Sequence, residues 1–214
     1  ACDCPVCRSA DPHDKRLRAS AMLDIKGKKI IIDAGPDFRY QMLRSQVKDL
    51  RAILLTHGHK DHIGGLDDVR AFNWVKQGAV DVYGNEGTRE VVYKDFSYAF
   101  AAFRYPGVPE INYHVIDDRP FYIDDIQVVP IPVLHYKMPV LGFRIGNFAY
   151  ITDAKTIPAS SMERLKGVEY LVINALRKEL HMSHFNLEEA LTMIARIQPK
   201  SAFLTHIGHQ MGLS

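Results

Sequence analysis

The chain has 214 residues, of which 47% are hydrophobic and 24% are charged. This length can bury a sizeable core and suits one domain better than two, so we expect a single domain over residues 1–214. The 27 basic and 25 acidic residues leave a formal net charge of +2. Because basic and acidic residues are nearly equal in number, the charge argues against a dedicated nucleic-acid surface. Two short basic clusters, at 15–18 and 26–29, are better interpreted as the solvated edge of a hairpin.

Hydropathy and cysteine usage indicate where the protein works. The sequence contains no run of about 20 apolar residues and no secretory segment at its start, so we expect a cytoplasmic protein without a membrane partner. Its three cysteines are Cys2, Cys4 and Cys7. They are too close together for a disulfide framework, and an odd number would leave one unpaired. Metal ligation is therefore the better interpretation.

The first half of the chain alternates predicted strands and helices. Strands at 18–25 and 28–33 are joined at Lys26-Gly27, a dipeptide suited to a tight turn because glycine tolerates positive φ. Hydrophobic periodicity then predicts a helix at 37–47, a strand at 51–55, a helix at 66–77 ended by Gly78, a strand at 80–83 and a helix at 86–102. The run 106–109 contains two prolines and a glycine, so it is expected to be a loop.

The second half is richer in strands. They are predicted at 111–116, 126–133, 141–145, 148–152, 170–173 and 201–204, with helices at 158–165 and 186–197. Asn186 followed by Glu189 has the spacing of a capping box. Two sets of strands, each followed by helices, predict an α/β fold in which two sheets stack and helices cover the outer faces, which gives four layers.

Aromatic residues of the first half are expected in the core. Trp74 and the aromatic stretch at 96–103 have helical spacing, which is more typical of core positions than of a substrate platform.

The segment from Leu54 to Leu66 carries the strongest functional signal. An apolar strand runs directly into His57-Gly58-His59-Lys60-Asp61-His62, so four metal-capable side chains fall within six residues. Imidazole and carboxylate donors suit zinc, iron or manganese, and the glycines let the backbone turn sharply enough to direct the side chains to different ions. Four such donors in this order have no use in packing.

Three further donors follow predicted strands directly. His135, Asp153 and His206 each stand at the carboxyl end of a strand. Taken singly, each would more often be an ordinary loop residue. Strand-end donors at one edge of a sandwich converge, however, and together with the four donors of the histidine-rich loop they make the seven ligands that two four-coordinate ions sharing one carboxylate require.

This pattern resembles the metallo-β-lactamase superfamily, whose signature His-x-His-x-Asp-His stands here at His57–His62. The resemblance implies an αββα sandwich with two divalent ions. It assigns His57, His59 and His135 to one ion, Asp61, His62 and His206 to the other, and Asp153 to a bridging position. Asp33, in the run Ile31-Ile32-Asp33-Ala34-Gly35, would orient the ligand loop through hydrogen bonds. True β-lactamases commonly carry cysteine where Asp153 stands, and the aspartate points to the hydrolase and phosphodiesterase branches.

A second metal site is predicted in the segment 1–10. Cys2, Cys4 and Cys7 supply three thiolates, one short of a closed tetrahedral zinc site. His209 lies three residues beyond His206 and is our candidate for the fourth ligand of this structural zinc.

Together, the two metal patterns are similar to the phosphoribosyl cyclic phosphate phosphodiesterases of the carbon-phosphorus lyase pathway, over nearly the whole chain. These enzymes open a cyclic phosphodiester on ribose, and the likeness implies that His184 is a catalytic histidine beside the metals. Relatives have a first strand before the cysteines and a closing strand after the last histidine, so the fold is expected to lack both strands here.

The combined hypothesis is a hydrolase that acts on a small or cyclic phosphodiester through a metal-bridged hydroxide, with His184 and Asp61 as catalytic residues. Alternatives that share these ligands are a tRNA-processing endonuclease, a lactonase or esterase, and a binding protein like the PQQ-biosynthesis protein B. A homodimer is compatible with the family. Four residues near predicted strand ends remain open between substrate contact and solvated loop, namely Lys137, Asn174, Arg177 and His181.

Overall fold

The computed structural model describes residues 2–212, and its contacts divide the chain into two compact units. The five-stranded unit comprises residues 18–117, and the six-stranded unit comprises residues 2–17 and 118–212. Within the described residues, no helix is long and apolar enough to cross a membrane.

The sheet of the five-stranded unit follows the chain order from β1 to β5. Its strands are β1 (Ala21–Ile25), β2 (Lys28–Ile32), β3 (Ala52–Leu54), β4 (Val80–Gly84) and β5 (Ile111–Val115). Only β1 and β2 are antiparallel, whereas β2 to β5 are parallel. Lys26 and Gly27 both have positive φ, 54° and 84°, as a two-residue hairpin turn requires. The predicted hairpin is confirmed.

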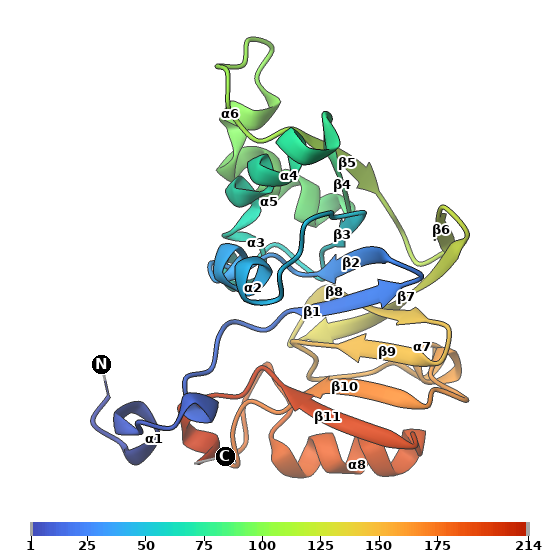
Figure 1. Cartoon of the computed structure of the whole chain (residues 1–214). Helices are drawn as coiled ribbons and strands as arrows, with labels where there is room; N and C mark the ends of the chain where they lie inside the picture. Colours follow the sequence, from blue (N-terminus) through green and yellow to red (C-terminus); the bar gives the residue numbers. More distant parts are fainter. Residues whose placement is uncertain (1, 213–214) are drawn as a thin grey trace. The chain divides into compact units, whose positions relative to one another are not determined.

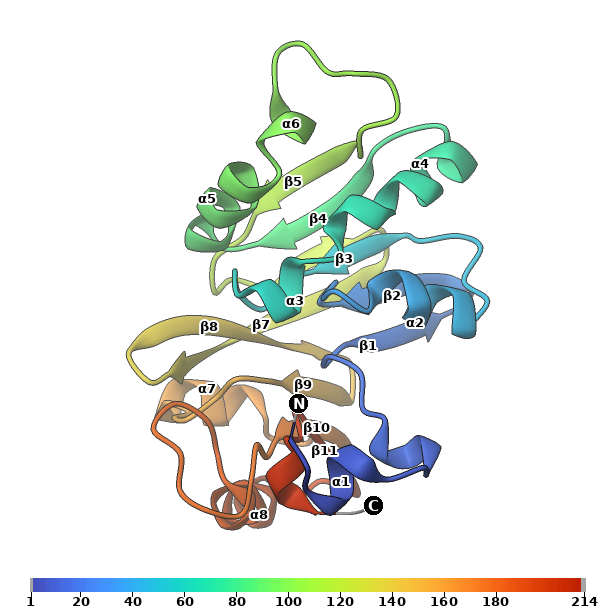
Figure 2. The ribbon, with the colours of Figure 1, turned by 90° about the vertical axis from the view of Figure 1, so that its left-hand side faces the viewer.

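Short helices connect these strands. They are α2 (Phe38–Arg44), α3 (Lys60–Ile63), a 3₁₀ turn at Leu66–Val69, α4 (Arg70–Lys76), α5 (Glu86–Asp95) and α6 (Ser97–Phe100). Figures 1 and 2 show α2, α4 and α5 on the same face of the sheet. Phe38 of α2, Phe72 of α4 and Val92 of α5 are buried against Ile53 and Val82 of the sheet. This apolar layer holds the strand that leads into the histidine-rich loop.

Three expectations for this half of the chain were wrong in detail. The helix expected at 66–77 begins as a 3₁₀ turn, and Gln77 with a φ of 54°, rather than Gly78, takes the left-handed position that ends α4. The helix expected at 86–102 is broken into α5 and α6. Trp74 is 73% exposed because α4 turns Phe72 and Asn73 inward, which leaves position 74 on the outer face.

The sheet of the six-stranded unit has the order β11-β10-β9-β8-β7-β6. Its strands are β6 (Phe121–Ile123), β7 (Ile126–His135), β8 (Met138–Ile145), β9 (Phe148–Ile151), β10 (Tyr170–Asn174) and β11 (Ser201–Thr205). Strands β6 to β9 are antiparallel neighbours, and β9, β10 and β11 are parallel. Hence β7, β9, β10 and β11 run in the same direction and end at the same edge. The short strand β6 was not predicted.

Two helices pack on this second sheet, α7 (Ala159–Arg164) and α8 (Leu187–Ile197). The capping box at the start of α8 is confirmed, because Asn186 Oδ1 accepts a hydrogen bond from the Glu189 backbone N–H at 3.0 Å and the Glu189 carboxylate accepts one from the Asn186 N–H at 3.0 Å. Each cap satisfies a backbone donor that the first helical turn leaves without an intrahelical acceptor.

Both ends of the described chain lie within the six-stranded unit and contact each other. Helix α1 (Pro5–Arg8), a 3₁₀ turn at Pro12–Asp14 and a 3₁₀ turn at His209–Met211 were not predicted. Arg16 joins the two ends, since its guanidinium donates to the carbonyl oxygens of Gly208 at 3.3 Å and Gly212 at 2.8 Å. The basic cluster at 15–18 had predicted a solvated edge. For Arg16 this prediction was wrong, because its guanidinium is bound to backbone carbonyl oxygens.

Candidate metal centre

The five-stranded unit places four predicted ligands directly after β3. His57 and His59 lie in the loop, and Asp61 and His62 lie in α3. His57 Nε2 is 3.0 Å from His59 Nδ1, and the His57 and His62 ring centroids are 4.3 Å apart. The sequence motif thus folds into a compact cluster of nitrogen donors, which suits a borderline cation such as zinc.

Asp33 holds this loop from the end of β2. Its side chain is fully buried, and its φ of 64° turns it out of the line of the strand. The carboxylate accepts hydrogen bonds from the Thr56 backbone N–H at 2.8 Å and from His62 Nδ1 at 2.7 Å. A carboxylate that accepts from His62 Nδ1 leaves the Nε2 lone pair of that ring for a metal. The orienting contact predicted for Asp33 is present.

Two glycines allow the backbone after β2 to touch α3. A Cβ atom on Gly35 would lie 2.1 Å from the Asp61 carbonyl oxygen, and one on Gly65 would lie 2.1 Å from the Gly35 carbonyl oxygen. Such contacts are far below van der Waals distance, so neither position has room for a side chain. The close approach fixes α3, and with it Asp61 and His62.

The six-stranded unit gathers the other predicted donors at one edge of its sheet. Asp153 Oδ1 is 3.2 Å from His206 Nε2, and Asp153 Oδ2 is 3.3 Å from His184 Nε2. Ligand atoms of His135, Asp153 and His184 all lie within 4.8 Å of one another. His135 ends β7, Asp153 and His206 follow β9 and β11, and His184 lies in the loop before α8, so segments far apart in the sequence form one cluster.

Backbone and side-chain hydrogen bonds fix this second cluster. His135 Nδ1 donates to the Ser183 carbonyl oxygen at 2.8 Å, which leaves its Nε2 lone pair for a metal. The amide of Asn174 is buried and binds both the N–H of Ala154 at 2.8 Å and its carbonyl oxygen at 3.0 Å. Since Ala154 follows Asp153, Asn174 holds the backbone next to this carboxylate and does not contact solvent.

Two of the candidate ligands, which follow strands β9 and β11, are in a costly backbone conformation. Asp153 has a φ of 59° and His206 a φ of 54°, both in the left-handed region. Non-glycine residues there carry strain on the order of 1–3 kcal/mol each. Such strain persists where the surrounding structure enforces it, and here it turns the side chains out of the sheet toward the cluster.

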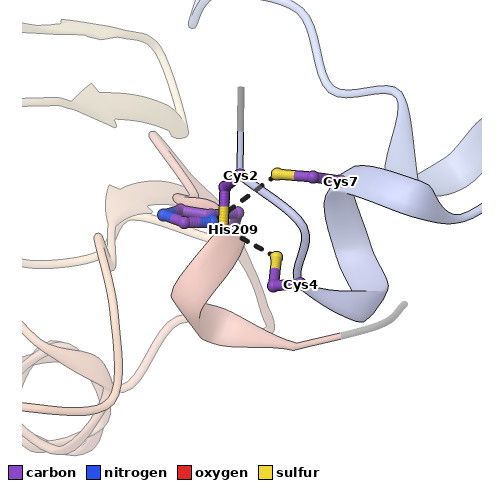
Figure 3. Close-up of side chains that lie close together, drawn as sticks. All are labelled: Cys2, Cys4, Cys7 and His209. Carbon is purple, nitrogen blue, oxygen red and sulfur yellow. Dashed lines mark hydrogen bonds between the residues drawn. The ribbon is translucent and has the colours of Figure 1, made fainter.

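A separate cluster unites Cys2, Cys4 and Cys7 with His209, as Figure 3 shows. His209 Nδ1 lies 3.3 Å from Cys4 Sγ and 3.6 Å from Cys7 Sγ, and the four ligand atoms are all within 4.8 Å of one another. Three thiolates and one imidazole match the donor set of a closed tetrahedral zinc site. Helix α1 and the 3₁₀ turn at His209–Met211 bring the donors together.

The thiols of this cluster influence one another. A hydrogen bond from the Cys7 backbone N–H, together with the His209 side chain, lowers the pKa of Cys4 to about 6. Hydrogen bonding to Cys4, burial and the charge of the neighbouring thiolates raise the pKa of Cys7. The lowered pKa favours the thiolate form of Cys4, which is the form that ligates metal.

Lys137, Arg177 and His181, which the sequence left open between substrate contact and solvated loop, each make their own contacts in the structure. Arg177 donates to the Leu180 carbonyl oxygen at 2.7 Å and shapes the loop before His184, while Lys137 lies over the Tyr136 ring at 5.4 Å. His181 Nδ1 is 3.2 Å from His184 Nδ1, and burial together with the charge of His184 lowers the pKa of His181.

The buried Thr56 was not singled out by the sequence analysis, because a lone threonine before a histidine gives no signal in one sequence.

The sequence and fold of this chain are similar to those of known proteins. The family model of the beta-lactamase superfamily domain matches residues 28–207, which is most of the chain. The chain belongs to the metallo-β-lactamase superfamily. Its two sheets with their helices are the mixed α/β fold expected of such a hydrolase, and the predicted fold class is confirmed. The His and Asp clusters fit the divalent metal ions that this fold binds.

Solved structures of this superfamily resemble the chain closely. The crystal structure described as a new diphosphatase from the PhnP family has a TM-score of 0.91 and 39% identity, covering 98% of this chain and 80% of that chain. Human tRNase Z, short form, has a TM-score of 0.73 at 18% identity, covering 92% of this chain and 88% of that chain. Zn(2+)-bound PqqB from Methylobacterium extorquens has a TM-score of 0.74 at 20% identity, covering 98% and 84%. The last two support the fold alone.

Curated relatives are longer than this chain. An octanoyltransferase from Porphyromonas gingivalis is 40% identical over 215 residues, which covers 99% of this chain and 43% of that protein. A ribonuclease Z from Nostoc punctiforme is 30% identical over 121 residues, which covers 55% of this chain and 37% of that protein. The chain therefore spans less than half the length of either relative, and their names describe the whole proteins.

Proposed function

We propose that this chain is a metal-dependent phosphodiesterase that hydrolyses a small or cyclic phosphodiester. The observation that carries the proposal is the pair of donor clusters that follow the strands. It is supported by a solved structure, 39% identical to this chain, that is described as a diphosphatase of the PhnP family. Aspartate at position 153 supports the same conclusion, since its oxygens are harder ligands than a thiolate and suit the metals of phosphate chemistry.

The proposal includes the ligand assignment that the family resemblance implies. His57, His59 and His135 would hold one divalent ion, Asp61, His62 and His206 a second, and Asp153 would serve both. Cys2, Cys4, Cys7 and His209 would hold a structural zinc. Two ions of this kind, when bound, activate water and neutralise charge on the phosphoryl oxygens.

The protein's own contribution is orientation and proton transfer. Asp33 and Ser183 accept the Nδ1 protons of His62 and His135, so both imidazoles present Nε2 in a fixed direction. The His184 side chain is 11% exposed, and its Nε2 lies 3.3 Å from Asp153 Oδ2, beside the carboxylate that we propose as a metal ligand. In its protonated form it would donate a proton to the departing alkoxide, which would otherwise leave as a strong base.

A substrate panel tests the function directly. We expect the metal-loaded protein to hydrolyse an activated aryl phosphodiester and a five-membered cyclic phosphodiester, with activity lost in a chelator and restored by zinc, manganese or iron. A lactone in the same assay distinguishes the esterase alternative. Metal-dependent turnover of the lactone with none of either phosphodiester would contradict the proposal.

A nuclease remains a second candidate, because a relative that is 30% identical over 121 residues carries the name ribonuclease Z. Cleavage of a precursor tRNA, with binding that weakens steeply as salt rises, would favour this reading over a small-molecule substrate. A protein that binds metal only at the cysteines and hydrolyses none of these substrates would instead be a binding module.

The role of His184 can be separated from metal binding. We expect His184→Ala to retain its metal ions and to slow an alkyl phosphodiester by about 10²-fold or more, while an aryl ester with a good leaving group is slowed far less. His13→Ala is a suitable control, since His13 pairs with Asp11 on the exposed surface. Unchanged turnover of the alkyl ester would rule out the general-acid assignment.

A further inference from the structure

Thr56 stands between two residues of the candidate metal centre and has no role in the function described so far. It directly precedes His57 and is completely buried. Its Oγ1 lies 2.9 Å and 3.1 Å from the two carboxylate oxygens of Asp33 and 2.9 Å from His57 Nδ1. All three residues belong to the five-stranded unit, so this chain of contacts lies within one compact part of the molecule.

The direction of each hydrogen bond follows from donor and acceptor chemistry. The Asp33 carboxylate also accepts from the Thr56 backbone N–H and from His62 Nδ1, and an ionised carboxylate has only acceptor positions. Thr56 therefore donates its single hydroxyl hydrogen to Asp33. The hydroxyl oxygen can then act only as an acceptor toward His57, so the proton of the His57 ring resides on Nδ1.

We infer that Thr56 is a positioning residue that sets the tautomer and the orientation of His57 as a metal ligand, and that it relays the influence of Asp33. Asp33 acts on His62 directly and on His57 through the threonine hydroxyl. One buried carboxylate thus prepares Nε2 of two histidines for coordination. The inference rests on the proposed function only in that His57 is a metal ligand.

A matched pair of variants tests this inference. Thr56→Val keeps the shape of the side chain and removes the hydroxyl, whereas Thr56→Ser keeps the hydroxyl. We expect Thr56→Val to weaken zinc binding by about 10- to 100-fold in competition with a chelator, the range seen when residues that orient metal ligands are changed, and Thr56→Ser to restore affinity to within a few fold. Thr88→Val, a substitution at a buried threonine of α5, is the control and should leave the affinity unchanged.

A spectroscopic readout separates tautomer control from simple loss of packing. In proton-nitrogen correlation spectra of histidine side chains, we expect the Nδ1-bound proton of His57 in the original protein and in Thr56→Ser, and its loss or rapid exchange in Thr56→Val. If Thr56→Val does not fold, Thr56→Ala removes the same hydroxyl without adding volume and takes its place. Unchanged zinc affinity and an unchanged Nδ1 proton in the variant lacking the hydroxyl would overturn the inference.

These measurements need no substrate, so they remain informative if the phosphodiesterase proposal fails. Loss of activity in the panel with intact zinc binding would contradict the substrate class alone. Unchanged zinc affinity together with an unchanged Nδ1 proton in Thr56→Val would contradict the positioning role of Thr56 alone.

Discussion

Asp153→Asn is expected to reduce hydrolysis by about 10³-fold or more. Both oxygens of Asp153 face histidine nitrogens, at 3.2 Å and 3.3 Å, and the side chain is only 2% exposed. Asparagine keeps the shape but removes the negative charge and replaces one carboxylate oxygen with an amide donor, so it would be a poor substitute for the carboxylate that we propose as a ligand of both divalent ions. Losing several kcal/mol of charge stabilisation in the transition state corresponds to a decrease of this size.

The measurement pairs activity with metal content. Elemental analysis should show fewer divalent ions per chain in Asp153→Asn, while circular dichroism should show a folded protein. Asp24→Asn is a matched control, because Asp24 lies in the β1–β2 hairpin and pairs with Lys29 at 3.1 Å. Full metal content with normal activity in Asp153→Asn would exclude Asp153 as a metal ligand.

Cys4→Ser is expected to release one zinc per chain and to destabilise the six-stranded unit by several kcal/mol. The cysteine cluster joins helix α1 to the turn at His209–Met211, and a structural zinc contributes its binding energy to folding. A serine hydroxyl is a poor zinc ligand because it is not ionised at neutral pH. The remaining three ligands would leave the site open.

Thermal unfolding and zinc analysis check this result together. We expect a melting temperature lower by several degrees, and a smaller difference between the two proteins once zinc is removed from both with a chelator. Ser9→Ala is a control just beyond α1 that leaves the thiolates intact. Equal zinc content in Cys4→Ser and the original protein would show that Cys4 does not hold zinc.

Local sequence patterns were sufficient for much of the fold. The hairpin turn at Lys26-Gly27 follows from backbone freedom at glycine, and the start of α8 follows from the Asn186 and Glu189 capping box. Both are decided by residues within a few positions of each other. Trp74 was misplaced for the opposite reason, since helical periodicity alone does not tell which face of a short helix the rest of the unit will cover.

The same distinction holds for the candidate site. By itself, the sequence determined the chemistry of the donors and the family, because the spacing from His57 to His62 and the three cysteines at the start are local patterns. Only the tertiary structure decided that Asp153, His184 and His206 meet at one sheet edge, that Asn174 holds the backbone next to Asp153, and that Thr56 links Asp33 to His57. Those contacts join residues that are distant along the chain, and which of them form depends on strand order and on the burial that packing produces.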